Sequence, residues 1–202
     1  MAEWFAELDP AVSAKIVRAL ARIEQGNLSN VKRVGEGVLE YRIDFGPGYR
    51  IYFGRDGETI IILLTGGTKK RQQAISMRRM LTGRNTSGAS AREAERRRAM
   101  ARTKSFKELV QGRVKADKKF AEALLREGID AMLSGDVDTG KAILRDYIKA
   151  TVGFEELGEA TGAPPKSLIR MFGPRGNPQA KNLFSVLGYL QKRAGLSLHV
   201  AG

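Results

Sequence analysis

The chain has 202 residues, of which 42% are hydrophobic, and it contains no cysteine. The apolar fraction is ordinary for a globular protein, which excludes a disordered chain, and the length suits one large domain or two small ones. Because cysteine is absent, disulfides and Cys-ligated zinc are excluded.

Neither the N-terminal residues nor the most apolar stretch of the chain indicates a membrane protein. The N-terminus carries acidic residues where a signal peptide would carry basic ones. The longest aliphatic run, residues 60–64, is far shorter than the ~20 residues that a spanning helix needs. We therefore expect a cytoplasmic protein with no membrane partner.

The positive charge is unevenly distributed. Lys and Arg number 35 against 22 acidic residues, a net charge of +13, and residues 83–107 alone carry eight basic and two acidic side chains. Such an excess favours a polyanionic partner through counterion release. Charge alone does not distinguish RNA, DNA or an acidic protein, and a basic protein without a nucleic-acid partner remains an alternative.

The first 82 residues combine one helical pattern with several strand patterns. Asp9-Pro10 predicts a helix start, apolar residues follow at helical spacing, and Gly26-Asn27 predicts the end. Three stretches joined by short glycine-containing turns then predict an antiparallel meander over residues 37–45, 49–53 and 59–64. The last stretch is almost wholly apolar and is expected to be central. A helix is expected over residues 69–81.

Alternation with a period of two divides the first two predicted strands between two faces. The inward side chains would be Leu39, Tyr41, Ile43, Phe45, Ile51 and Phe53. The opposite face would carry Glu40, Arg42, Arg50 and Tyr52, with Lys69 and Lys70 beyond the next strand. Two arginines, a tyrosine and a carboxylate on an open face suit an RNA-cleaving site. The alternative is that these charges are only the solvated face of a sheet.

In such a site, the ribose 2′-hydroxyl would attack the phosphorus, and arginines would stabilise the charge of the phosphorane. The single histidine, His199, lies in the other half of the chain, so a His–His acid–base pair is impossible. Tyr52, Glu40 or a lysine would replace imidazole. We expect this chemistry to be metal-independent, with no metal site and no cofactor.

From about Ala116 onward, every apolar pattern is helical, and residues 154–172 form the most specific one. Leu157 lies on the inner face of a short first helix, and Gly158 permits a close crossing by the second helix. Gly162 can supply a left-handed turn, and Pro165 suits the first turn of the second helix. Together these features predict a helix-turn-helix.

The second helix of this motif divides into an apolar and a polar face. Leu168, Met171 and Phe172 would point inward. The DNA-binding candidates are Lys166, Ser167 and Arg170 on the other face, together with Arg175 and Asn177 in the following loop. An ordinary helical hairpin with solvated basic residues is the alternative.

Residues 102–202 resemble the HigA-type addiction-module antidote family, which has a Cro/repressor-like fold. The match is carried by residues 116–133, Leu157-Gly158, Thr161-Gly162, Ser167-Leu168, Arg170, Gly176-Asn177-Pro178 and Val186-Leu187-Gly188. The resemblance implies operator DNA as a partner and a homodimer formed through the helix-turn-helix domain.

Residues 1–82 resemble the phage-derived HigB-like toxins of the RelE/ParE superfamily. The match is carried by Gly26-Asn27, Val34-Gly35, Gly37-Val38, Glu40, Arg42, residues 46–53, residues 62–64, Gly66-Gly67, Lys69-Lys70 and Gln72. The resemblance implies an α+β domain with helices packed on a small antiparallel sheet. It also implies mRNA and the ribosome as partners.

These observations predict three segments: a RelE/ParE-like toxin domain over 1–82, a basic connector over 83–107, and an all-α helix-turn-helix domain over 108–202. The leading interpretation is a fused type II toxin–antitoxin protein. Its C-terminal domain would bind operator DNA and neutralise the N-terminal domain, a ribosome-dependent mRNA endonuclease, through an intramolecular contact. The alternatives are a transcriptional repressor carrying an inactive toxin remnant, and a ParE-like toxin that inhibits gyrase.

Overall fold

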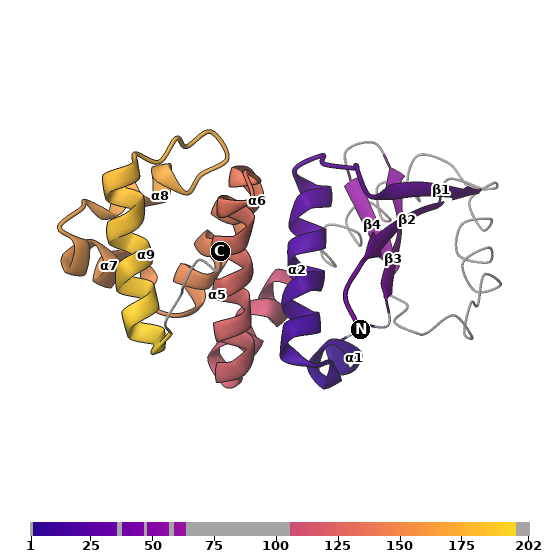
Figure 1. Cartoon of the computed structure of the whole chain (residues 1–202), viewed down its shortest axis with the longest axis horizontal. Helices are drawn as coiled ribbons and strands as arrows, with labels where there is room; N and C mark the ends of the chain where they lie inside the picture. Colours follow the sequence, from indigo (N-terminus) through magenta and orange to yellow (C-terminus); the bar gives the residue numbers. More distant parts are fainter. Residues whose placement is uncertain (1, 36–37, 47, 57–58, 64–105, 197–202) are drawn as a thin grey trace, which may run out of the picture. The chain divides into compact units, whose positions relative to one another are not determined.

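A computed structural model describes residues 2–35, 38–46, 48–56, 59–63 and 106–196 (Figure 1). The chain divides into two compact units, of which one comprises residues 1–2 and 26–107 and contains the strands. The other comprises residues 3–25 together with residues 108–202. The first helices of the chain therefore belong to the same compact unit as its C-terminal helices.

Within the described residues, the strands form a four-stranded antiparallel sheet in the order β1-β2-β3-β4. The strands are β1 (Val31–Gly35), β2 (Val38–Ile43), β3 (Tyr49–Asp56) and β4 (Thr59–Leu63). Each strand pairs with the next in sequence, as expected of a meander. Gly46 and Gly48, both at positive φ, lie in the turn between β2 and β3.

Two features of the sheet differ from the sequence prediction. β1 was not predicted, and four of its five residues are exposed, so the sequence offers no buried apolar face there. The stretch expected to be central, β4, lies at one end of the order of described strands. An apolar run indicates burial, but it does not determine which neighbours a strand pairs with.

The predicted inward face of the sheet is buried along most of its length. Its buried side chains are Tyr41, Ile43, Ile51 and Phe53. Leu39 is only partly buried. Phe45 is 37% exposed instead of inward, because β2 ends at Ile43 and the period of two does not continue into the turn.

The helical unit begins with α1 (Ala2–Glu7) and α2 (Pro10–Glu24). Asp9 caps α2 as predicted, because its carboxylate accepts hydrogen bonds from the backbone N–H groups of Ala11 at 2.8 Å and Val12 at 3.3 Å. The later helices are α5 (Lys118–Leu133), α6 (Val137–Ala150), α7 (Gly153–Thr161), α8 (Pro165–Met171) and α9 (Ala180–Ala194).

The C-terminal region is helical, as predicted, and Pro165 begins α8, in agreement with its predicted place in the first turn of the second helix. A helix over residues 106–116 was missed. Its buried side chains are Phe106, Val110 and Val114, which recur only every fourth residue among charged neighbours. This apolar stripe is narrower than the one that usually marks an amphipathic helix in a sequence. The predicted helix over 69–81 and the connector up to residue 105 lie outside the described residues. Among the described helices, none is long and apolar enough to cross a membrane.

The core of the helical unit lies where α2, α5 and α6 pack against one another (Figure 1). The closest approach between α5 and α6 occurs at two glycines. A Cβ added to Gly140 would lie 2.4 Å from Met132 Cγ and 2.8 Å from the backbone oxygen of Gly128. Only a residue without a side chain permits this crossing.

Arg113, on the helix over residues 106–116, holds α1 and the start of α2. Its guanidinium donates to the backbone oxygens of Phe5 and, at 2.6 Å, Leu8, and to Ser13 Oγ at 2.7 Å. It also lies 4.7 Å from the centroid of the Phe120 ring, which Phe5 meets edge-on at 5.8 Å. One side chain thus donates to carbonyl oxygens at and just after the end of α1, which have no N–H donor within the helix.

Gly140→Ala should destabilise the full chain by about 1–3 kcal/mol, because the new methyl group overlaps Met132 and the backbone of α5. The matched control is Gly112→Ala, in the helix over 106–116, where an added Cβ meets nothing within 4 Å. That change should stabilise the chain by about 0.5–1 kcal/mol. Urea denaturation of both variants measures the difference, and equal shifts would contradict the crossing described above.

Candidate functional site

The four candidate residues on β2 and β3 share one face of the sheet. The register pairs Glu40 with Tyr52 and Arg42 with Arg50 across the two strands. Residues directly opposite each other on antiparallel strands project to the same side, so these four side chains lie together. The structure therefore brings together four of the six predicted catalytic candidates, and Lys69 and Lys70 lie outside the described residues.

This face is less open than the sequence suggested. Arg50 Nε lies 3.5 Å from Glu40 Oε1, and the exposed fractions of the two side chains are 24% and 12%. Arg42, by contrast, is exposed. Arg50 Nε is buried and makes no hydrogen bond to the described residues, so the contact with Glu40 is an ion pair without good hydrogen-bond geometry. On β2 and β3 the face thus offers the exposed Arg42 beside a partly buried cation–carboxylate pair.

The second candidate site is the hairpin formed by α7 and α8. Gly162 ends α7 in a left-handed conformation with a φ of 69°, as predicted. A Cβ added to Gly158 would lie 2.8 Å from the oxygen of Ala163 and 3.0 Å from Pro165 Cγ, so the predicted close approach is present. Leu157 is fully buried. The turn between α7 and α8 therefore has the conformation that the sequence predicts.

The two faces of α8 also match the prediction. Its inward side chains are Leu168 and Met171, followed by Phe172, and all three are buried. Lys166, Ser167 and Arg170 are exposed. Ile169, which the sequence analysis did not single out, is 46% exposed among them. The exposed face therefore combines two cations, a hydroxyl and an aliphatic group.

The loop between α8 and α9 extends this surface. Arg175 and Asn177 are exposed in it, and Lys181 is exposed in the first turn of α9. Lys141 of α6 is buried at 4% exposure, and its Nζ lies 2.7 Å from the oxygen of Gly176. Sequence reasoning missed Lys141 and Lys181, because a lysine is normally solvated and nothing local marks either residue.

A polar cluster joins α7 to α9. Tyr189 donates a hydrogen bond of 2.9 Å to Glu156 Oε1, and Arg193 Nη1 lies 2.5 Å from the same oxygen. The hydrogen bond to Glu156 is the main cause that raises the pKa of Tyr189 above its ordinary value. The cluster fixes α9 against the hairpin.

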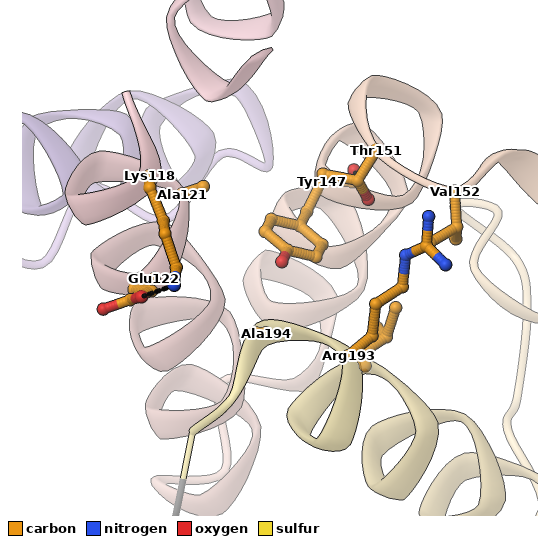
Figure 2. A pocket seen from close by; sticks show the side chains of 9 residues that line it. Lys118, Ala121, Glu122, Tyr147, Thr151, Val152, Arg193 and Ala194 are labelled. Carbon is orange, nitrogen blue, oxygen red and sulfur yellow. Dashed lines mark hydrogen bonds and ion pairs between the residues drawn. The ribbon is translucent and has the colours of Figure 1, made fainter. Parts of the chain in front are cut away.

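A cavity of about 190 Å³ lies between α5, the end of α6 and α9. Figure 2 shows the ring of Tyr147 between Lys118 and Glu122 on one side and Arg193 on the other. Burial raises the pKa of Tyr147, and the Glu122 carboxylate adds to this effect. No group of three or more metal-ligating side chains occurs among the described residues.

A third feature links α2 to α5 and α6. Glu127 of α5 is 6% exposed, and two cations of α2 neutralise it. Lys15 Nζ lies 2.5 Å from Glu127 Oε1, and Arg18 Nη1 lies 3.3 Å from Oε2. Arg18 also donates to Ser134 Oγ at 3.0 Å. A buried carboxylate on one helix thus depends on two cations of another.

The third cation of α2 pairs with the start of α6. Arg22 Nε donates to Asp136 Oδ2 at 2.5 Å. Asp136 is the N-cap residue of α6, but its side chain makes no capping hydrogen bond. Lys15, Arg18 and Arg22 follow the spacing i, i+3 and i+7, which places them on one face of α2. We call these three residues the α2 cation stripe.

Comparison with known proteins places the first part of this chain in a family. Residues 3–87 match the family described as "Phage derived protein Gp49-like (DUF891)". An uncharacterized protein of Haemophilus influenzae is 39% identical over 70 residues, which cover 34% of this chain and 71% of that protein. Comparison with solved structures found no match. The chain belongs to the Gp49-like family.

The Gp49-like proteins are a phage-derived toxin family of the RelE/HigB type. The matched residues include α1, α2 and all four strands, and they end before the helix over 106–116. The α2 cation stripe therefore belongs to the Gp49-like segment, whereas Glu127 and Asp136 do not. The pairs between them join two parts of the chain that are distinct in sequence.

Tyr147→Phe should reduce the loss of stability of the full chain at alkaline pH. Folding raises the pKa of Tyr147 above 10.0, the value for an unfolded chain. The contribution of its protonated phenol to the stability of the fold is therefore complete below pH 10 and is lost as the pH rises through the raised value. Thermal unfolding from about pH 8 to about pH 11 should show a shallower decline for the variant. Parallel curves for the two proteins would show that this phenol does not titrate differently on folding.

Proposed function

We propose that the chain is a fused toxin–antitoxin protein whose helical unit binds operator DNA and restrains its Gp49-like segment. The supporting observation is the packing of α2, a helix of the toxin-family segment, against α5 and α6 through the α2 cation stripe. In this interpretation, α5 and α6 are the antitoxin, and the stripe is its intramolecular contact.

The energetics of Glu127 favour a stable contact. Removal of one partner from a buried ion pair costs about 3–5 kcal/mol, because an uncompensated charge remains in a poorly solvated site. Lys15 and Arg18 are partly exposed, with side-chain exposures of 30% and 18%, so the cost here lies at or below the lower end of that range. That is still a large share of the stability of a small domain.

On the toxin side, we propose that the shared face of β2 and β3 cleaves RNA. Arg42 and Arg50 would stabilise the negative charge of the phosphorane. Glu40 or Tyr52 would accept the proton of the ribose 2′-hydroxyl, and Lys69 or Lys70 would protonate the leaving oxygen. The ion pair with Glu40 would keep Arg50 on this face before substrate arrives. The mRNA would be presented on the ribosome.

On the antitoxin side, we propose that α7 and α8 form a helix-turn-helix. The support comes from the left-handed Gly162, the close approach at Gly158 and the exposed Lys166, Ser167 and Arg170 on α8. Arg175 and Asn177 would contact the same duplex from the loop. Two such surfaces would be joined by dimerisation through this unit, because half-sites of operators mirror a two-fold axis.

A second candidate is a transcriptional repressor whose Gp49-like segment no longer acts as a toxin. The observation that favours it is the burial of Phe5 and Ile16, which makes α1 and α2 part of the core of the helical unit. In that case selection would retain these helices for stability alone. A third candidate, inhibition of gyrase by protein contact, would use the same sheet face without cleavage.

Arg170→Ala should weaken binding of the full chain to its operator by about 1–3 kcal/mol, because it removes a charged contact to a base edge. The matched control is Arg126→Ala, which removes an exposed arginine from α5. Gel-shift titrations at one fixed salt concentration measure both variants. If the two variants bind equally well, α8 is not the helix that reads DNA.

Glu127→Lys should release the toxin segment in the full chain, because it places a third cation beside Lys15 and Arg18. Expression of this variant should arrest growth and degrade mRNA, and adding Arg50→Ala should abolish both effects. The control is Asp130→Lys, an equal charge change at an exposed site of α5. Circular dichroism and amide exchange in α2 report folding and release.

The outcomes separate the three candidates. Growth arrest with degraded mRNA supports the endonuclease, and growth arrest with intact mRNA supports a toxin that acts on a protein partner. Normal growth despite a released α2 and a folded sheet supports the repressor with an inactive remnant.

A further inference from the structure

Lys141 is a lysine that the fold buries at 4% exposure on α6. Burial of an ammonium group is unfavourable unless acceptors surround it, so its neighbours indicate why it is tolerated. Its Nζ lies 2.7 Å from the oxygen of Gly176, 3.5 Å from the oxygen of Pro174 and 2.8 Å from Asp138 Oδ1. Three acceptors thus face the three donors of one ammonium group.

Two of these acceptors belong to the loop over residues 173–178, between α8 and α9. A Cβ added to Gly176 would lie 2.2 Å from the oxygen of Met171 and 2.3 Å from that of Arg170, so the loop is packed against the end of α8. Within the loop, Gly176 N–H donates to the oxygen of Gly173 at 2.9 Å. Lys141 therefore holds a loop that is also seated on α8.

The side chains next to these anchored carbonyls are the outer DNA-binding candidates. Arg175 lies between Pro174 and Gly176, and Asn177 follows Gly176; both are exposed. Because Gly176 packs on the carbonyl of Arg170, the loop continues the exposed surface of α8. A loop containing two glycines would otherwise sample many conformations, and ordering it on binding would cost affinity.

We propose that Lys141 is the positioning residue of the DNA-binding surface. It does not touch DNA; it fixes the backbone of residues 174–176 so that Arg175 and Asn177 meet the duplex beside Arg170. This inference rests on the proposed DNA binding and adds to it a residue that acts from the opposite side of the loop. Its ammonium group donates hydrogen bonds from α6 to the loop carbonyls, which an apolar side chain cannot do.

The test compares variants of the full chain on one duplex, chosen from a random pool by selection on the wild-type protein. Lys141→Met keeps the volume and removes the charge, and it should weaken binding about tenfold, the size of one lost specific contact. Lys149→Met removes an exposed cation from the same helix and should change binding less than about twofold.

A double-mutant cycle separates positioning from general stability. In a chain that already carries Arg175→Ala and Asn177→Ala, Lys141→Met should cost less than about twofold, because its effect passes through those two side chains. In amide exchange without DNA, the variant should expose the amides of Gly173 and Gly176 while α5 and α6 stay protected. An additive cycle, or unchanged loop amides, overturns the inference.

A second variant covers the case in which Lys141→Met does not fold. Gly176→Ala keeps the lysine side chain but lifts the loop, and with it the carbonyl acceptors of Lys141, from α8. It should give the same tenfold loss and the same coupling to Arg175 and Asn177. If the wild-type chain retains no duplex from the pool, the proposed DNA binding is wrong. The inference then falls with it, whatever the loop amides show.

Discussion

Glu127 carries a buried carboxylate whose cations, Lys15 and Arg18, lie on a helix more than a hundred residues earlier in the chain. Lys15 and Arg18 of α2 supply the positive charge that compensates this buried carboxylate. α2 also packs against both α5 and α6. Arg113 and Phe120 in turn hold α1, through the Leu8 carbonyl and the Phe5 ring. The helical unit therefore depends on α2, and the boundary between family segments is not a boundary between compact units.

α6 contacts both the Gp49-like segment and the loop proposed to bind DNA. At its first turn, Asp136 accepts from Arg22 of the Gp49-like segment. Slightly more than one turn later, Lys141 holds the loop that carries Arg175 and Asn177. Both contacts lie on one helix, so in the proposed function a change in how α2 sits would be passed to the loop through α6.

What the sequence could predict was local in origin. The cap of α2, the left-handed Gly162 and the division of α8 into two faces each follow from a few neighbouring residues. The shared face of Glu40 and Arg50 followed from a period of two, but their pairing and partial burial did not. Burial of Lys141 and Glu127 was not predictable, because each depends on acceptors or cations far away in sequence. β1 lacked the buried stripe that marks a strand.

Joining the proposed toxin and antitoxin in one chain changes how their contact can be opened. Linkage in one chain replaces the protein concentration with an effective concentration, which for short flexible linkers in general is on the order of millimolar. A contact with an intrinsic dissociation constant of about 10 μM would then be closed about 99% of the time, whatever the protein concentration. Opening it half of the time requires a loss of about 2.7 kcal/mol. That loss is close to the ~3 kcal/mol of stability that is lost when one partner of a buried ion pair is removed. In the proposed function, loss of the Glu127 charge would therefore open the contact to a similar extent, whereas dilution or a change in expression level would not.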